Sequence, residues 1–97
     1  MATLSTHVLD TATGRPAAGV AVSVEKESEV IARGVTDADG RIGHLAESLE
    51  PGRYRLVFEL EGRFFKRVAL DVEIGSDPKY HVPLLVTPFG LTSYRGS

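Results

Sequence analysis

Apolar side chains recur at every second residue along much of this chain, and this period of two restricts its fold more than any other feature. Residues 20–25 read V-A-V-S-V-E, residues 53–60 read R-Y-R-L-V-F-E-L, and residues 68–74 read V-A-L-D-V-E-I. Successive side chains of a β-strand point to opposite faces, so each segment would place one apolar face on a core and leave the other for solvent or a partner. No window holds a convincing helical period. The pattern predicts an all-β fold.

Turn-forming residues separate these segments at regular intervals. The turn signals are Thr13–Pro16, Asp37–Gly40, Glu50–Gly52, Glu61–Gly62 and Gly75–Pro78. Strands about 8 to 12 residues apart with such turns between them are typical of a β-sandwich or barrel. We predict eight strands, near residues 3–9, 20–26, 29–36, 41–45, 53–60, 66–74, 80–86 and 91–96.

Length and composition limit the class of protein further. With 97 residues the chain predicts a single domain, residues 1–97, whose hydrophobic core alone would be marginal. The net charge of −2 does not support binding to nucleic acid or to an anionic membrane, and the absence of cysteine excludes disulfides and a thiol nucleophile. No apolar run approaches the roughly 20 residues of a membrane span, and the first residues do not resemble a secretory signal. We therefore expect a cytoplasmic protein.

Four motifs connect the chain to a known family. They are L-S-T-H-V-L-D at residues 4–10, D-G-R at 39–41, Y-H-V-P-L-L-V-T-P-F-G at 80–90, and Y-R-G-S at 94–97. Together they resemble the transthyretin-related 5-hydroxyisourate hydrolases, over nearly the whole chain and most specifically at its two ends. The resemblance implies a transthyretin-like (prealbumin-like) β-sandwich of two four-stranded sheets. It also implies a short helix between the fifth and sixth strands, but only residues 61–66 separate our candidates, so we expect that helix to be missing or reduced to a turn.

Two other functions remain open at this point. The middle of the chain, at residues 14–20, 36–41 and 49–56, also resembles the carboxypeptidase-regulatory-like modules, which are structural or carbohydrate-binding domains without enzymatic activity. Transthyretin itself, a hormone carrier, shares the architecture but lacks the C-terminal tetrapeptide. The motifs at the two ends favour the hydrolase over both.

The resemblance implies an active site made of four residues that are far apart in the sequence: His7, Arg41, His81 and Ser97. On our strand placement they lie on the first, fourth, seventh and eighth strands, which form one sheet in a transthyretin-like fold. The alternation also puts Leu4, Thr6 and Val8 on the face opposite to His7, where they would belong to the core.

The residue types suit hydrolysis. The pKa of histidine lies closest to neutrality, so His7 and His81 could divide the tasks of activating water and protonating a leaving nitrogen. The planar guanidinium of Arg41 suits the binding of carbonyl or enolate oxygens and the stabilisation of an oxyanion. We expect Ser97 to bind substrate or to orient a histidine rather than act as a nucleophile. Tyr94 and Arg95 are further substrate-binding candidates, although either could instead anchor the last strand.

As the family does, the protein would open the six-membered ring of 5-hydroxyisourate at an amide-like C–N bond. The product would be 2-oxo-4-hydroxy-4-carboxy-5-ureidoimidazoline, an intermediate of urate breakdown. The reaction would need no metal and no cofactor. The resemblance further implies a homotetramer, a dimer of dimers, with active sites at the interface between dimers. Which histidine is the general base stays open.

Overall fold

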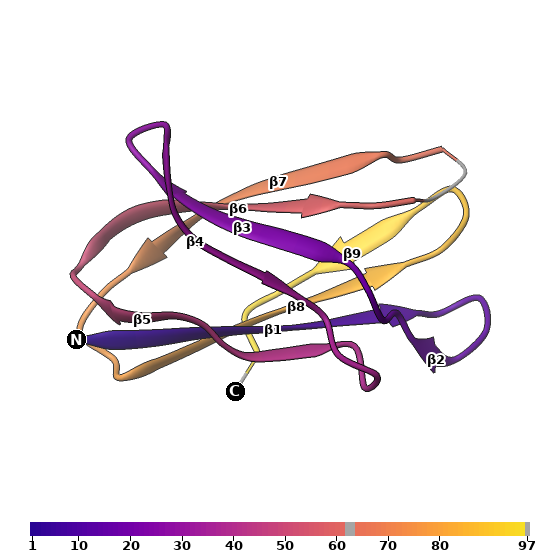
Figure 1. Ribbon diagram of the computed structural model, residues 1–97, viewed down its shortest axis with the longest axis horizontal. Helices are drawn as coiled ribbons and strands as arrows, with labels where there is room; N and C mark the ends of the chain where they lie inside the picture. Colours follow the sequence, from indigo (N-terminus) through magenta and orange to yellow (C-terminus); the bar gives the residue numbers. More distant parts are fainter. Residues whose placement is uncertain (62–63, 97) are drawn as a thin grey trace.

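The computed structural model describes residues 1–61 and 64–96, and within them every regular element is a β-strand (Figure 1). In chain order the strands are β1 (Ala2–Asp10), β2 (Arg15–Pro16), β3 (Ala21–Lys26), β4 (Glu29–Val35), β5 (Arg41–Leu49), β6 (Gly52–Glu59), β7 (Arg67–Ile74), β8 (Lys79–Val86) and β9 (Leu91–Ser93). The all-β fold predicted from the sequence is confirmed.

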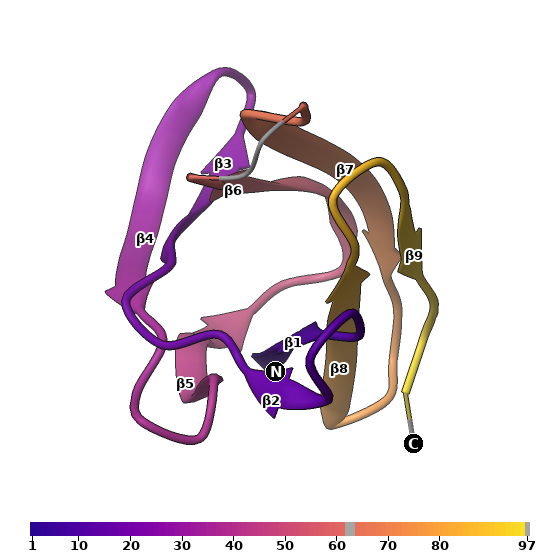
Figure 2. The same cartoon turned by 90° about the vertical axis from the view of Figure 1, so that its right-hand side faces the viewer.

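The strands form two sheets that lie face to face, as the end-on view in Figure 2 shows. One sheet has the order β4-β3-β6-β7, with all neighbours antiparallel. The other has the order β2-β1-β8-β9, and β5 pairs with β1 along the same edge as β2. The pair β1–β8 is parallel, so the beginning of the chain lies beside a segment more than 70 residues later. This pair forms the centre of the second sheet, to which the predicted site strands belong.

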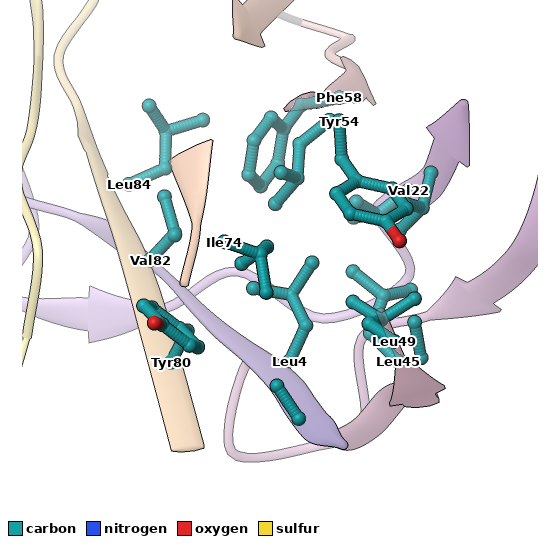
Figure 3. Close-up of a cluster of buried hydrophobic side chains, with 14 of the residues drawn as sticks. Leu4, Val22, Leu45, Leu49, Tyr54, Phe58, Ile74, Tyr80, Val82 and Leu84 are labelled. Carbon is teal, nitrogen blue, oxygen red and sulfur yellow. The ribbon is translucent and has the colours of Figure 1, made fainter. Parts of the chain in front are cut away.

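The hydrophobic core fills the space between the sheets and comes from the alternating positions of both (Figure 3). Leu4, Val8, Leu56, Phe58 and Leu84 are completely buried. Thr6 is also buried in this layer, and its hydroxyl donates a 2.6 Å hydrogen bond to the carbonyl oxygen of Val82. Because Leu4, Thr6 and Val8 face inward as predicted, Ser5 and His7 between them face outward.

Three details differ from the prediction. Arg15–Pro16 form an additional short strand, β2, so the second sheet has five strands instead of four. The strand predicted at 41–45 continues to Leu49, because register shifts in its pairing with β1 and the positive φ of Ser48 interrupt the alternation that marks a strand in sequence. The strand predicted at 91–96 ends at Ser93, and Gly96 returns to the sheet as an isolated bridge to His81.

The connection between β6 and β7 is short, as expected. The N–H of Leu60 donates to the carbonyl oxygen of Lys66 at 2.9 Å and closes the connection where the two strands end. The described residues contain no helix, and so none that is long and apolar enough to cross a membrane.

Candidate active site

Three of the four predicted site residues meet on the outer face of the second sheet. In the register between β1 and β5, His7 lies opposite Arg41. In the parallel register between β1 and β8, Ser5 lies opposite His81. Ser5 and His7 are two residues apart and share a face, so His81, His7 and Arg41 occupy adjacent positions across three neighbouring strands. The sheet thus brings together groups that are 34 to 74 residues apart in the sequence.

The turn at residues 37–40 holds both His7 and Arg41 in place. The Asp37 carboxylate accepts hydrogen bonds from the N–H of Asp39 at 2.9 Å and of Arg41 at 3.0 Å. These bonds, the one from Arg41 above all, lower the pKa of Asp37, and the charges of Arg41 and His7 act in the same direction. The turn directs the carbonyl oxygen of Asp39 at His7, whose Nε2–H donates to it at 2.9 Å. Neutral His7 therefore carries its proton on Nε2, and its Nδ1 is left as an acceptor.

His81 is half-buried and forms hydrogen bonds to two other segments of the chain. Its Nδ1 is 2.8 Å from the hydroxyl oxygen of Ser5 on β1. Its backbone carbonyl oxygen accepts a 2.7 Å hydrogen bond from the N–H of Gly96. Burial of the ring, and the neighbouring charges of His7 and Arg41, lower the pKa of His81 below its ordinary value. Near neutral pH this histidine is consequently uncharged and able to accept a proton.

The segment after β9 passes over His81, but its side chains point to different places. The guanidinium of Arg95 pairs with the Asp77 carboxylate at 3.0 Å and lies over the Tyr80 ring, 4.4 Å from its centroid. Arg95 therefore ties this segment to the sheet. Tyr94 is 55% exposed. Ser97, the fourth predicted catalytic residue, lies outside the described residues.

The site lies on an open sheet surface and not in either of two hollows found elsewhere in the molecule. One hollow, of about 370 Å³, opens between the ends of the sheets and is lined by apolar side chains such as Val8, Leu60 and Phe65. The other, of about 610 Å³, lies on the outer face of the opposite sheet, beside Arg33. Across residues 1–61 and 64–96 there is no cluster of three side chains suited to holding a metal ion. A substrate on His7, Arg41 and His81 would be covered by the protein on one side only.

Sequence reasoning missed three contributors to this arrangement: Ser5, the carbonyl group of Asp39, and Gly96. Alternation did put Ser5 on the face of His7, but only the parallel register of β1 and β8 shows that it lies opposite His81. The other two act through the backbone, so their side chains gave no chemical signal. His44, which is not among the four predicted residues, is exposed on β5 and pairs with Glu47 at 2.8 Å.

The chain is similar to known proteins over its full length. Residues 4–96 match the HIUase/Transthyretin family. A 5-hydroxyisourate hydrolase of Caulobacter vibrioides is 41% identical over 116 residues, covering all of both chains. The solved 5-hydroxyisourate hydrolase of Klebsiella pneumoniae has a TM-score of 0.91 at 43% identity, again covering both chains completely. Sea bream transthyretin, solved in complex with thyroxine, has a TM-score of 0.89 at 27% identity, over 97% of this chain and 94% of that one. Backbone shape alone does not separate these proteins, whereas the sequence identity is higher to the hydrolase than to transthyretin.

Proposed function

This chain belongs to the HIUase/Transthyretin family, and on that premise we propose that its outer-face site carries out the hydrolysis of 5-hydroxyisourate. The protein is a 5-hydroxyisourate hydrolase of urate degradation. The observation that carries this conclusion is the juxtaposition of His7, Arg41 and His81 on one sheet face. A binding module without enzymatic activity has no need of two histidines and an arginine fixed together in this way.

His81 is the general base in the proposed mechanism. Its lowered pKa keeps it neutral near pH 7, and with Nδ1 turned to Ser5 its Nε2 remains for the reacting water. His81 removes a proton from water as the water oxygen forms a bond to the substrate carbonyl carbon. Arg41, on the other side of His7, stabilises the negative charge that develops on the carbonyl oxygen.

His7 is the proton donor in this scheme. Its Nε2 is engaged by Asp39, so only Nδ1 is available to the substrate. When the C–N bond breaks, His7 in its protonated form delivers a proton from Nδ1 to the leaving nitrogen. Proton exchange with solvent then restores both histidines. The proposal thus gives the two histidines separate roles, which the sequence left open.

The remaining predicted residues keep supporting roles in the proposal. Arg95 is held by Asp77 and Tyr80, which supports anchoring of the C-terminal segment over direct contact with substrate. Exposed Tyr94 and the terminal Ser97 remain proposed substrate contacts.

We further propose that the active protein is a homotetramer, a dimer of dimers, with sites at the interface between dimers. Two features support this. Within residues 1–61 and 64–96 the site face has no opposite wall, and two half-buried apolar residues, Leu9 and Leu85, lie on the same face as the histidines. A second copy would cover this apolar surface and exclude water from the substrate. Sedimentation at several protein concentrations, read beside specific activity, tests the proposal: activity should be lost as the tetramer dissociates, and a fully active monomer would refute it.

The proposed function has a direct test. 5-Hydroxyisourate is generated in the cuvette from urate by urate oxidase, and its ultraviolet decay is followed with and without this protein. We expect decay well above the spontaneous rate. A folded preparation that leaves the spontaneous rate unchanged would instead indicate a binding protein that retains the family's residues. The proposed location is the cytoplasm, which fractionation of the source cells would test.

A further inference from the structure

We propose that Ser5 is a positioning residue for His81: its hydroxyl oxygen accepts the Nδ1–H of His81 and so presents the unprotonated Nε2 to the reacting water. The proposal rests on the hydrolase function for its catalytic consequence, but not for the contact itself. Ser5 belongs to none of the four residues that the family resemblance implied, and no role had been assigned to it from the sequence.

The contact joins two strands at the centre of the sheet and involves no loop. Ser5 and His81 are register partners in the parallel pair β1–β8, and the atoms Oγ and Nδ1 are 2.8 Å apart. On the opposite face of the same pair, buried Thr6 bonds the carbonyl oxygen of Val82. Since the neighbouring strand positions are fixed by the core, Ser5 can hold the imidazole at a constant orientation.

We infer the direction of the hydrogen bond from a second polar neighbour of the Ser5 hydroxyl. The Ser5 hydroxyl also faces the backbone carbonyl oxygen of Tyr80, at a weak 3.5 Å, and a carbonyl oxygen can only accept. If Ser5 donates its proton there, its oxygen is free to accept from His81 Nδ1–H. In this arrangement the Ser5 hydroxyl both donates and accepts. It is compatible with neutral His81 and with the imidazolium that forms when Nε2 takes a proton. The reverse arrangement would require the hydroxyl to turn around in each catalytic cycle.

No charged group near His81 among the described residues is positioned to orient its ring in place of Ser5. His7 on β1 and Arg41 on β5 are the charged neighbours that act on its ring. From the segment after β9, the described residue nearest the ring is Gly96, while the guanidinium of Arg95 is turned to Asp77. A hydrogen bond from Nδ1–H to Ser5 stabilises the imidazolium more than the neutral ring. Its loss should lower the pKa of His81 further.

The variants form a matched set. Ser5→Thr keeps the hydroxyl, and Ser5→Val has the same branched shape without it, so the two differ in one polar group at a strand position that accepts both. Ser5→Ala is a smaller second removal in case the valine is poorly accommodated. Ser93→Ala is the control: it removes a hydroxyl from the same sheet, bonded at 2.9 Å to the carbonyl oxygen of Pro83, without touching His81.

The first readout needs no substrate. The chain has three histidines, so ¹⁵N spectra of the imidazoles can be assigned with single-histidine variants. At about pH 8, where a histidine of lowered pKa is neutral, we expect His81 to carry its proton on Nδ1 in the wild type and in Ser5→Thr. In Ser5→Val and Ser5→Ala we expect the common mixture of tautomers. A wild-type His81 protonated on Nε2 would overturn the proposal.

The second readout is the pH dependence of kcat/KM. Ser5→Val and Ser5→Ala should lower kcat about 10-fold or more, a part of what a positioned base contributes, with KM little changed. The acid limb of the kcat/KM profile should move to lower pH in Ser5→Val and Ser5→Ala. In Ser5→Thr and Ser93→Ala it should match the wild type. A shift to higher pH would mean that Ser5 donates to His81, and an unmoved limb would mean a structural role only; either result overturns the proposal. A wild type with the Nδ1–H tautomer and no turnover would refute the hydrolase and leave the contact established.

Discussion

Gly96 lies against the imidazole ring of His81, so close that a side chain at this position has no room. A Cβ on Gly96 would stand 2.6 Å from Cδ2 of the ring and 3.3 Å from Cγ, well inside the normal contact distance. The backbone hydrogen bond from Gly96 to the His81 carbonyl fixes this approach. The glycine of the C-terminal motif therefore has a steric purpose: it lets the segment pass over the ring of the proposed base.

Replacing Gly96 by alanine should displace the His81 ring and reduce kcat about 10-fold or more, because a small misplacement of a catalytic group is costly. The melting temperature should change little, since Gly96 contributes no side chain to the core. Gly43→Ala is the matched control, because a Cβ there meets no atom within 4 Å. Equal activities of the two variants would show that the ring tolerates the displacement.

Replacing His81 by alanine should abolish most turnover and preserve the fold, because the side chain lies on the outer face and the core layer beside it is untouched. The loss expected for a general base is about 10²- to 10⁴-fold in kcat. His44→Ala provides the comparison, since it removes an exposed histidine that pairs with Glu47 and has no assigned part in the mechanism. Circular dichroism and the 5-hydroxyisourate assay measure both effects. Retention of full activity in His81→Ala would remove it from the mechanism.

Because the pKa of His81 is lowered, both activity and folding stability should decrease as the pH falls below neutrality. Activity requires the neutral His81 ring, so the acid limb of kcat/KM should lie below the ordinary histidine pKa of about 6.5. In the unfolded state His81 takes up a proton near its ordinary pKa, whereas in the folded state it does so only at lower pH. This contribution to stability is therefore fully present above about pH 6.5 and is lost as pH falls through the lower, folded pKa. Urea unfolding of the wild type and of His81→Asn between about pH 5 and pH 8 isolates the effect: the difference between them should change in this window, and a constant difference would contradict the shift.

Replacing Gly40 by alanine should damage both stability and activity. Gly40 has a φ of 74°, and its Cβ would collide with the carbonyl oxygen of Val8 and lie 3.0 Å from the Cβ of Pro16. Backbone strain of this kind costs roughly 1–3 kcal/mol before the collision is counted. The turn that presents Asp39 to His7 would move as well. Gly14→Ala separates the two causes, because Gly14 has a φ of 75° and open space around it. Similar unfolding free energies for the two variants would show that the collision is relieved at no cost.

Much of the fold could be predicted because its signal is local. Alternation marked the buried positions, including Leu56 and Phe58, and it identified the outward face of His7. What it missed has a physical reason. Bulged pairing with β1 hid the second half of β5, and the two-residue strand β2 is too short to show any period.

Part of the site could also be predicted from sequence and part could not. His7, Arg41 and His81 were found because their side chains form part of recognisable motifs. Ser5 shares a motif with His7, yet its partner depends on a parallel register between strands 76 residues apart, which no local pattern encodes. The contributions of Asp39 and Gly96 come from the backbone and from the absence of a side chain. Such contacts become visible only in three dimensions.

The parallel pairing of β1 with β8 also has a consequence during synthesis. Thr6 emerges from the ribosome 76 residues before the carbonyl group that its hydroxyl contacts. At 5–20 residues per second, about 4 to 15 s pass during which the edge of β1 that pairs with β8 has no partner. Catalytic competence thus arises late in translation, and the nascent chain is exposed to aggregation or chaperone capture until then.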